Sequence, residues 1–211
     1  GRLLNWTGLT FAAWIKTESA SGSRAIIGSF DAAGASSEGA MWLSTGTTLQ
    51  FDTSAVVAYR QWLFGTVSTG IWHHVAVTRI NVSQDSNSIL GYVDGVVSPL
   101  SGYVSVGGAA APGTKSDTAI GRLGEFNGYY FAGRIDNPTM WLRALSSNEI
   151  YGIYNSGAPV YADTANAPYD SGLQGMFRLD ENTGSTTAGV GCTNVGTISG
   201  ATWTNGLVPL P

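Results

Sequence analysis

The strongest fold signal lies in Ile71-Trp-His-His-Val-Ala-Val-Thr78 and in Leu90-Gly-Tyr-Val-Asp-Gly95. The first stretch is rich in β-branched and aromatic residues and places apolar side chains on both faces, which is typical of a long strand. The second stretch leads through Asp94-Gly95 into Val96–Ser98, and glycine tolerates the positive φ that a tight turn requires. This region therefore predicts a strand followed by a β-hairpin.

Strand signals continue on both sides of this region. Residues 9–16 alternate with a period of two, so that Trp14 shares the more polar face with Thr10 and Lys16. Further strands are expected over residues 24–31, 38–45, 48–53, 117–122, 129–141 and 173–181. A spacing of about 8–12 residues between such signals is typical of an all-β sandwich or barrel.

One short helix interrupts the strands. Ser146 is followed three residues later by Glu149, which is a capping-box pattern, and Gly157 is placed to cap the other end. We divide the chain into a core over residues 1–157, an extended linker over 158–172, and a C-terminal β segment over 173–211.

The composition excludes several classes of protein. The 211 residues are 43% hydrophobic and only 11% charged, and the net charge is −4, so no basic footprint for nucleic acid is present. No stretch of about 18 apolar residues exists that could span a membrane as a helix. A weakly charged surface rich in Ser, Thr and Gly leads us to expect an extracellular or virion-surface location.

Five segments, in this order, are similar to motifs of the laminin-G-like, concanavalin A-like lectin and glucanase jelly-roll superfamily. They are Leu9–Lys16, Ile71–Thr78, Leu90–Gly95, Phe131–Asp136 and Trp141–Ser146. The resemblance extends over about residues 7–157 and implies an all-β jelly-roll sandwich of two antiparallel sheets with one short helix.

The C-terminal segment departs from that pattern. Leu173-Gln-Gly-Met-Phe-Arg-Leu-Asp-Glu181 and Ala201-Thr-Trp203 resemble the strand and loop that open such a domain, yet here they close the chain. The segment could complete its own sandwich, dock on a neighbouring subunit as a donated strand, or belong to a tandem array. We favour completion of the chain's own sandwich, because termini usually lie close together.

Glycoside hydrolases of the same superfamily need two carboxyl groups that face each other. The five Glu residues are isolated, and Asp180 and Glu181 are neighbours that would point to opposite faces of a strand. His73 and His74 are likewise neighbours, so they cannot chelate one metal ion together. We therefore expect no enzymatic activity.

The resemblance implies that calcium is a possible ligand, because relatives in the family hold Ca²⁺ at the rim of the sandwich. The candidate ligands are Asp31, Asp94 and Asp136, which lie near expected strand ends. Asp94 has a structural alternative, because aspartate is favoured in a hairpin turn.

Aromatic residues are the candidate ligands for a sugar. The flat ring of a tryptophan can stack on a pyranose, and Trp14, Trp42 and Trp62 are expected to lie outside the core. The alternative is that these rings pack against the sheets.

Two functions follow as hypotheses. The first is a non-catalytic structural or assembly module, such as a virion decoration protein, a tail protein or an extracellular filament subunit, whose partners are other proteins or further copies of the chain. Its basis is the scarcity of charge, since interface cores are depleted in Lys and Glu. The second is a lectin-like adhesion module that binds glycan, with or without calcium.

Overall fold

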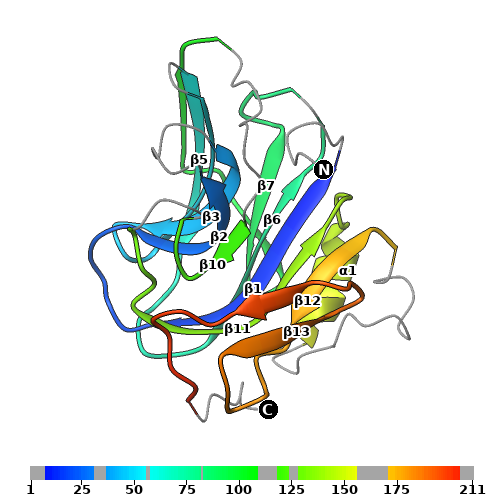
Figure 1. Cartoon of the computed structure of the whole chain (residues 1–211). Helices are drawn as coiled ribbons and strands as arrows, with labels where there is room; N and C mark the ends of the chain where they lie inside the picture. The colour runs from blue at the N-terminus through cyan, green and yellow to red at the C-terminus, as the bar shows by residue number, and fades with distance from the viewer. Residues whose placement is uncertain are drawn as a thin grey trace.

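The structure is a computed structural model that describes residues 8–30, 37–55, 58–81, 83–108, 118–123, 128–155 and 171–204. These residues form two antiparallel sheets and one short helix, which confirms the predicted all-β sandwich. In Figure 1 the six-stranded sheet, with β2, β3, β5 and β10 labelled, faces the eight-stranded sheet that contains β1, β11 and β12.

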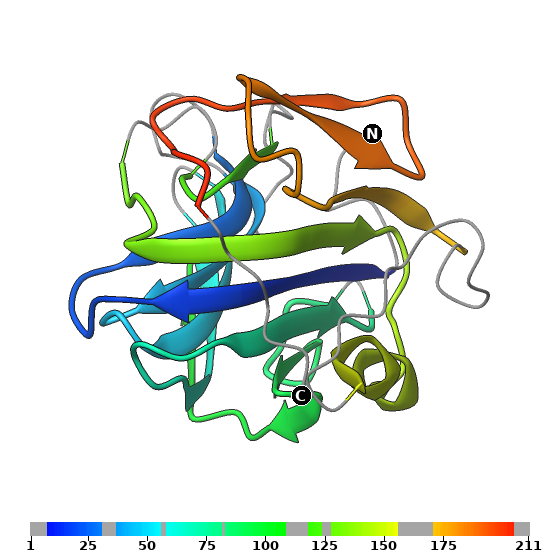
Figure 2. The same ribbon diagram turned by 90° about the horizontal axis from the view of Figure 1, so that it is seen from below.

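Figure 2 looks onto the eight-stranded sheet, in which β1 is central. From edge to edge the sheet contains β14 (Val195–Thr197), β13 (Thr186–Val190), β12 (Leu173–Phe177), β11 (Gly133–Trp141), β1 (Leu9–Thr17), β6 (His73–Arg79), β7 (Ile89–Val93) and β8 (Val96–Ser98). Asp94 and Gly95 join β7 to β8 with φ values of 50° and 75°, which confirms the predicted tight hairpin turn.

The second sheet has six strands. In order they are β10 (Thr118–Ile120), β2 (Arg24–Phe30), β3 (Ser37–Ser44), β4 (Thr48–Ala55), β5 (Ala58–Thr66) and β9 (Gly102–Val106). The sequence did not predict β5 and β9, which pair with each other along one edge. The strand predicted over 129–141 begins only at Gly133, the one predicted over 173–181 ends at Phe177, and β13 was not among the predicted strands.

The main core lies between the two sheets. Alternate residues of facing strands meet there, and the rings of Phe11, Phe51 and Trp62 form its aromatic centre. The Phe11 and Phe51 centroids are 6.3 Å apart, and those of Phe51 and Trp62 are 6.0 Å apart. All three rings are almost completely buried, and burial of apolar surface is the dominant favourable term in folding.

Helix α1 (Ser147–Tyr154) covers part of the opposite face of the eight-stranded sheet. Ile150 and Ile153 pack there with Tyr92 and Trp141 in a second apolar cluster. The predicted capping box is confirmed, because the Ser146 side chain accepts from the Glu149 N–H and the Glu149 carboxylate accepts from the Ser146 N–H. This helix, the one helix in the part of the chain that the structure describes, is too short to cross a bilayer.

The end of α1 differs from the prediction. Asn155 caps the helix in the left-handed conformation, with φ of 41°. Asparagine tolerates this region better than other side chains, so it takes the role that the sequence analysis gave to glycine. Gly157, the predicted cap, and most of the expected 158–172 linker lie outside the described residues.

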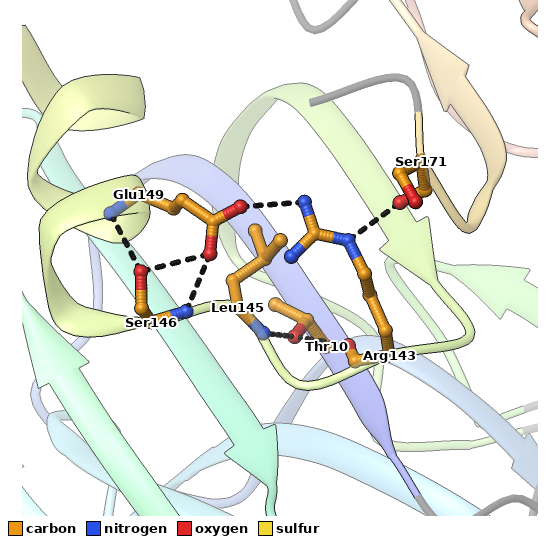
Figure 3. A network of polar contacts seen from close by, with 6 residues as sticks. All are labelled: Thr10, Arg143, Leu145, Ser146, Glu149 and Ser171. Carbon is orange, nitrogen blue, oxygen red and sulfur yellow. Dashed lines mark hydrogen bonds and ion pairs between the residues drawn. The ribbon is translucent and has the colours of Figure 1, made fainter. Parts of the chain in front are cut away.

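The C-terminal segment joins the eight-stranded sheet of its own chain. Strand β12 pairs with β11, with Thr139 opposite Met176. Figure 3 shows how the start of this segment is held: the Arg143 guanidinium donates to the Ser171 carbonyl at 2.6 Å and to the Glu149 carboxylate at 2.6 Å. One arginine thus connects the end of β11, helix α1 and the approach to β12.

Candidate functional site

Trp14 is buried, so its expected exposure is wrong. Its side chain is only 4% exposed, because helix α1 lies over this face of β1. The Tyr154 ring stacks on the indole at a centroid distance of 5.7 Å, and His74 meets it edge-on at 5.4 Å. The period-2 pattern placed Trp14 on the correct face, but it could not show that a helix covers that face.

The other two tryptophans have different surroundings. Trp62 is 1% exposed, faces the main core and donates its indole N–H to the Asp85 carbonyl at 2.9 Å, so its expected exposure is also wrong. Trp42 is half-buried on the outer face of the six-stranded sheet, which we define as the face directed away from the main core. Of the three candidate sugar-stacking rings, Trp42 is the one that reaches the surface.

The three candidate calcium ligands do not form a described metal site. Asp31 lies outside the described residues. Within the described ranges, no group of three His, Cys, Asp or Glu side chains could hold a metal ion. Burial raises the pKa of Asp136 to about 6, and the charge of Asp180 adds to the rise. Binding of calcium through Asp94 or Asp136 stays a prediction.

Asp94 belongs to an arrangement that has the outline of a catalytic triad. The Ser68 hydroxyl lies 2.8 Å from His73 Nε2, and His73 Nδ1 lies 2.7 Å from the Asp94 carboxylate. However, the Ser68 backbone N–H points at the same imidazole nitrogen, at 3.1 Å. It is therefore not free to stabilise an oxyanion, which acyl transfer requires. Asp94 also accepts from the His74 N–H at 2.9 Å. We therefore interpret Ser68, His73 and Asp94 as a structural hydrogen-bond network that joins β6 to the turn between β7 and β8.

We expect replacement of Asp94→Ala to destabilise the protein by about 2 kcal/mol. The change leaves two donors unpaired and puts alanine at a φ of 50°. Urea unfolding followed by tryptophan fluorescence measures the loss, and Ser68→Ala is the control, with an expected effect below about 0.5 kcal/mol. Hydrolysis of p-nitrophenyl acetate by the native protein that Ser68→Ala abolishes would contradict this interpretation.

A buried polar cluster lies on the outer face of the six-stranded sheet, around Asp52 of β4. Gln50 donates to one carboxylate oxygen at 2.7 Å, and Gln61 of β5 donates to the other at 3.2 Å. The Trp42 indole N–H also faces this carboxyl group, although it forms no hydrogen bond of normal geometry. Burial raises the pKa of Asp52 to about 7 against the opposing effect of these donors.

Aromatic rings lie beside this cluster. The Tyr129 ring meets Trp42 edge-on at 5.5 Å, and Tyr129 is 45% exposed. Tyr59 lies on the same strand as Gln61 and is 38% exposed. Polar groups with fixed directions next to partly exposed rings can bind a ligand that has both hydroxyls and an apolar face.

Sequence reasoning did not identify Gln50, Asp52 or Gln61. The only local signal was the alternation of Gln50 and Asp52 with Leu49 and Phe51, which predicts an ordinary polar face of a strand. The Asp52–Gln61 contact depends on the register between β4 and β5. Because β5 was not predicted, no feature of the sequence brought the two residues together.

Comparison with known proteins gives a family and a fold. A family model described as the concanavalin A-like lectin/glucanases superfamily matches residues 2–151. No curated protein matches the chain. A solved structure of a candidate carbohydrate binding protein from Bacteroides ovatus ATCC 8483 is 17% identical with a TM-score of 0.59, and the match covers 92% of this chain and 54% of that one. The chain thus spans about half the length of that protein, and the match shows the fold alone.

Two smaller structures are also similar in outline. CBM40 of the Ruminococcus gnavus IT-sialidase, bound to α2,3-sialyllactose, is 11% identical with a TM-score of 0.49, and the match covers 71% of this chain and 83% of that one. Domain 4 of a GH43 extracellular arabinanase from Geobacillus stearothermophilus, in complex with arabinotriose, is 16% identical with a TM-score of 0.46. That match covers 71% of this chain and 67% of the domain.

Proposed function

Because this chain belongs to the concanavalin A-like lectin/glucanases superfamily, we propose that it is a non-catalytic glycan-binding module. We place the binding surface on the outer face of the six-stranded sheet. One observation carries this proposal: Gln50, Asp52 and Gln61 form a hydrogen-bonded cluster beside the partly exposed rings of Trp42 and Tyr129. The carbohydrate-binding description of the similar Bacteroides ovatus protein supports the same class of ligand.

The chemistry of a sugar suits this surface. A pyranose presents hydroxyl groups around its edge and C–H groups on its faces, so an aromatic ring stacks on one part while amide groups hydrogen-bond to another. Proteins of this kind act where glycans are displayed, so we propose an extracellular or surface-exposed location. Glycan binding was the second hypothesis from the sequence, and the family assignment supports it better than the first, the assembly module.

We expect Tyr59→Ala and Tyr129→Ala each to weaken glycan binding at least tenfold. The wild-type chain is first screened on an array of immobilised mono- to tetrasaccharides, and the sugars to which it binds are then titrated by calorimetry. Tyr151→Ala is the matched control, because Tyr151 is 52% exposed on helix α1, against the other sheet, and its loss should change affinity by less than about twofold. An empty array, or retention that survives both tyrosine changes, contradicts the proposal.

Assembly remains the second candidate, and a specific observation favours it. Edge strand β8 exposes Val96 and Val97, and edge strand β9 exposes Val104 and Val106, with no charged side chain on either strand. Uncharged edge strands are open to pairing with another chain. Neither the family description nor the structures named above concerns a virus particle or a filament, so we rank this role below glycan binding.

A further inference from the structure

Gln61 is the member of the Asp52 cluster that reaches the surface. Gln50 is 4% exposed and Asp52 is 5% exposed, whereas Gln61 is half-buried. The Gln61 amide nitrogen donates to Asp52 Oδ2, so its carbonyl oxygen remains available to another donor. The ionised Asp52 carboxylate can only accept, so above its pKa of about 7 it fixes which end of the Gln61 amide faces a ligand, and the binding tests below are therefore made at about pH 8.5.

The surroundings of Gln61 are apolar. Tyr59 and Leu63 lie two residues away on either side along β5, and Val104 lies opposite on β9. Tyr59 and Val104 are 38% and 36% exposed. A ligand on this surface meets a directed acceptor beside uncharged side chains, so it must supply a hydrogen-bond donor to Gln61 and an apolar face to its neighbours.

Among the described residues, the side chains that hydrogen-bond to Asp52 are neutral, so this cluster offers an anionic ligand no cation. A nearby Lys or Arg would lower the pKa of Asp52, yet no charged side chain of the described residues contributes to its shift. The nearest arginine in sequence, Arg60, is 7% exposed and donates to the carbonyls of Tyr59, Val106, Gly107 and Gly108. Its guanidinium is engaged in holding β5 against the end of β9.

We propose that Gln61 sets the ligand class of this face: its carbonyl oxygen, held by Asp52, accepts a hydrogen bond from a hydroxyl of a neutral sugar, and the face rejects anionic sugars. This inference rests on the proposed glycan-binding function. It adds a residue, a hydrogen-bond direction and a charge preference to it.

The test uses the full chain and paired probes. Lactose is compared with 3′-sialyllactose, and xylo- and galacto-oligosaccharides are compared with oligogalacturonides, on an array and then by calorimetry. We expect the chain to bind only the neutral sugar of each pair. Gln61→Met should weaken the retained sugar at least tenfold, whereas Gln174→Met, a half-buried glutamine of β12, is the matched control and should change affinity less than twofold.

A second variant tests the direction of the hydrogen bond and leaves Gln61 in place. Asp52→Asn replaces one of the two accepting oxygens by an NH₂ group, so Gln50 and Gln61 can no longer both donate to it and the Gln61 amide is no longer held in one direction. We expect this variant to lose at least tenfold in affinity, and a deoxyfluoro sugar, which cannot donate at the substituted position, to bind the native protein at least tenfold more weakly than its parent.

The outcomes separate the inference from the function beneath it. If no probe is retained, the proposed function fails and the inference fails with it. If sugars are retained but anionic members bind as well as neutral ones, or Gln61→Met binds like the native chain, glycan binding stands and the role of Gln61 is overturned. Circular dichroism of each variant shows that lost binding does not come from lost folding.

Discussion

A chain that ends after Gly157 will lose cooperative unfolding, although it keeps nearly all of the segments that resemble the family. The truncation removes β12, which supplies hydrogen bonds along the edge of β11. It also removes Leu173 and Met176 from the cluster around Trp141, where each is at least nine-tenths buried. Burial of a side chain of this size is worth about 1.5–3 kcal/mol, against a total stability of about 5–15 kcal/mol.

The same truncation removes the polar attachment of the segment. Arg143 loses the Ser171 carbonyl, and the Leu142 N–H loses the Gly172 carbonyl. We therefore expect a full-length monomer with one urea transition, and a truncated chain that aggregates or shows no transition. Val195→Ala is the control within the segment, because Val195 is 67% exposed and its loss should change stability by less than about 0.5 kcal/mol.

Two alternative outcomes have definite meanings. If the truncated chain keeps a single transition with a similar midpoint, the segment does not complete the sandwich. If the full-length chain is an oligomer and a peptide of residues 171–204 restores the fold of the truncated one, the segment acts as a strand donated between copies. Solution mass, measured by light scattering, distinguishes these cases.

The sequence predicted the fold because strand signals are local. Alternation over residues 9–16, the Asp94-Gly95 turn and the Ser146 capping box each depend on a few neighbouring residues, and each is found in the structure. Strand β5 escaped prediction because Arg60 and Gln61 interrupt it with polar groups. Arg60 is buried there only because carbonyls near residue 107, far along the chain, accept from its guanidinium.

The site could not be predicted because it depends on contacts between distant segments. Trp14 is covered by Tyr154, which lies on a helix about 140 residues later in the chain. The Asp52 carboxyl group acquires its second partner, Gln61, through the register of two strands. Burial by distant segments and strand register are tertiary properties, and periodicity within one strand does not encode them.

Two buried groups will give the protein opposing responses to pH, and single substitutions will separate them. The pKa of Asp52 is raised from 3.8 to about 7 by burial, and the pKa of His74 is lowered from 6.5 to about 4 by burial, against the charge of Asp94. His74 is 1% exposed, between Trp14 and Tyr154. Both groups are therefore neutral in the folded protein over most of the range between pH 4 and pH 7.

The signs follow from proton binding. Between pH 4 and pH 7 the folded state holds a proton on Asp52 that the unfolded state releases, so this residue makes stability fall as pH rises. Over pH 4 to 6.5 the unfolded state protonates His74 and the folded state does not, so this residue makes stability rise with pH. One unit of pKa corresponds to about 1.4 kcal/mol, so the contribution of Asp52 to the stability change is about 4 kcal/mol and that of His74 is about 3 kcal/mol in the opposite direction. The two contributions nearly cancel.

The variants Asp52→Asn and His74→Gln each remove one of these slopes. We compare the free energy of unfolding of each variant with that of the native protein at the same pH. From pH 4 to pH 7 this difference should rise by about 4 kcal/mol for Asp52→Asn. From pH 4 to pH 6.5 it should fall by about 3 kcal/mol for His74→Gln. The raised pKa of Asp136 acts in the same direction as that of Asp52, but it is present in all three proteins and cancels in the differences. Any packing defect shifts a whole curve and leaves its slope unchanged. Urea unfolding at half-unit pH intervals measures the slopes, and curves that run parallel to the native one would show that the two groups titrate in the folded protein as they do in the unfolded chain.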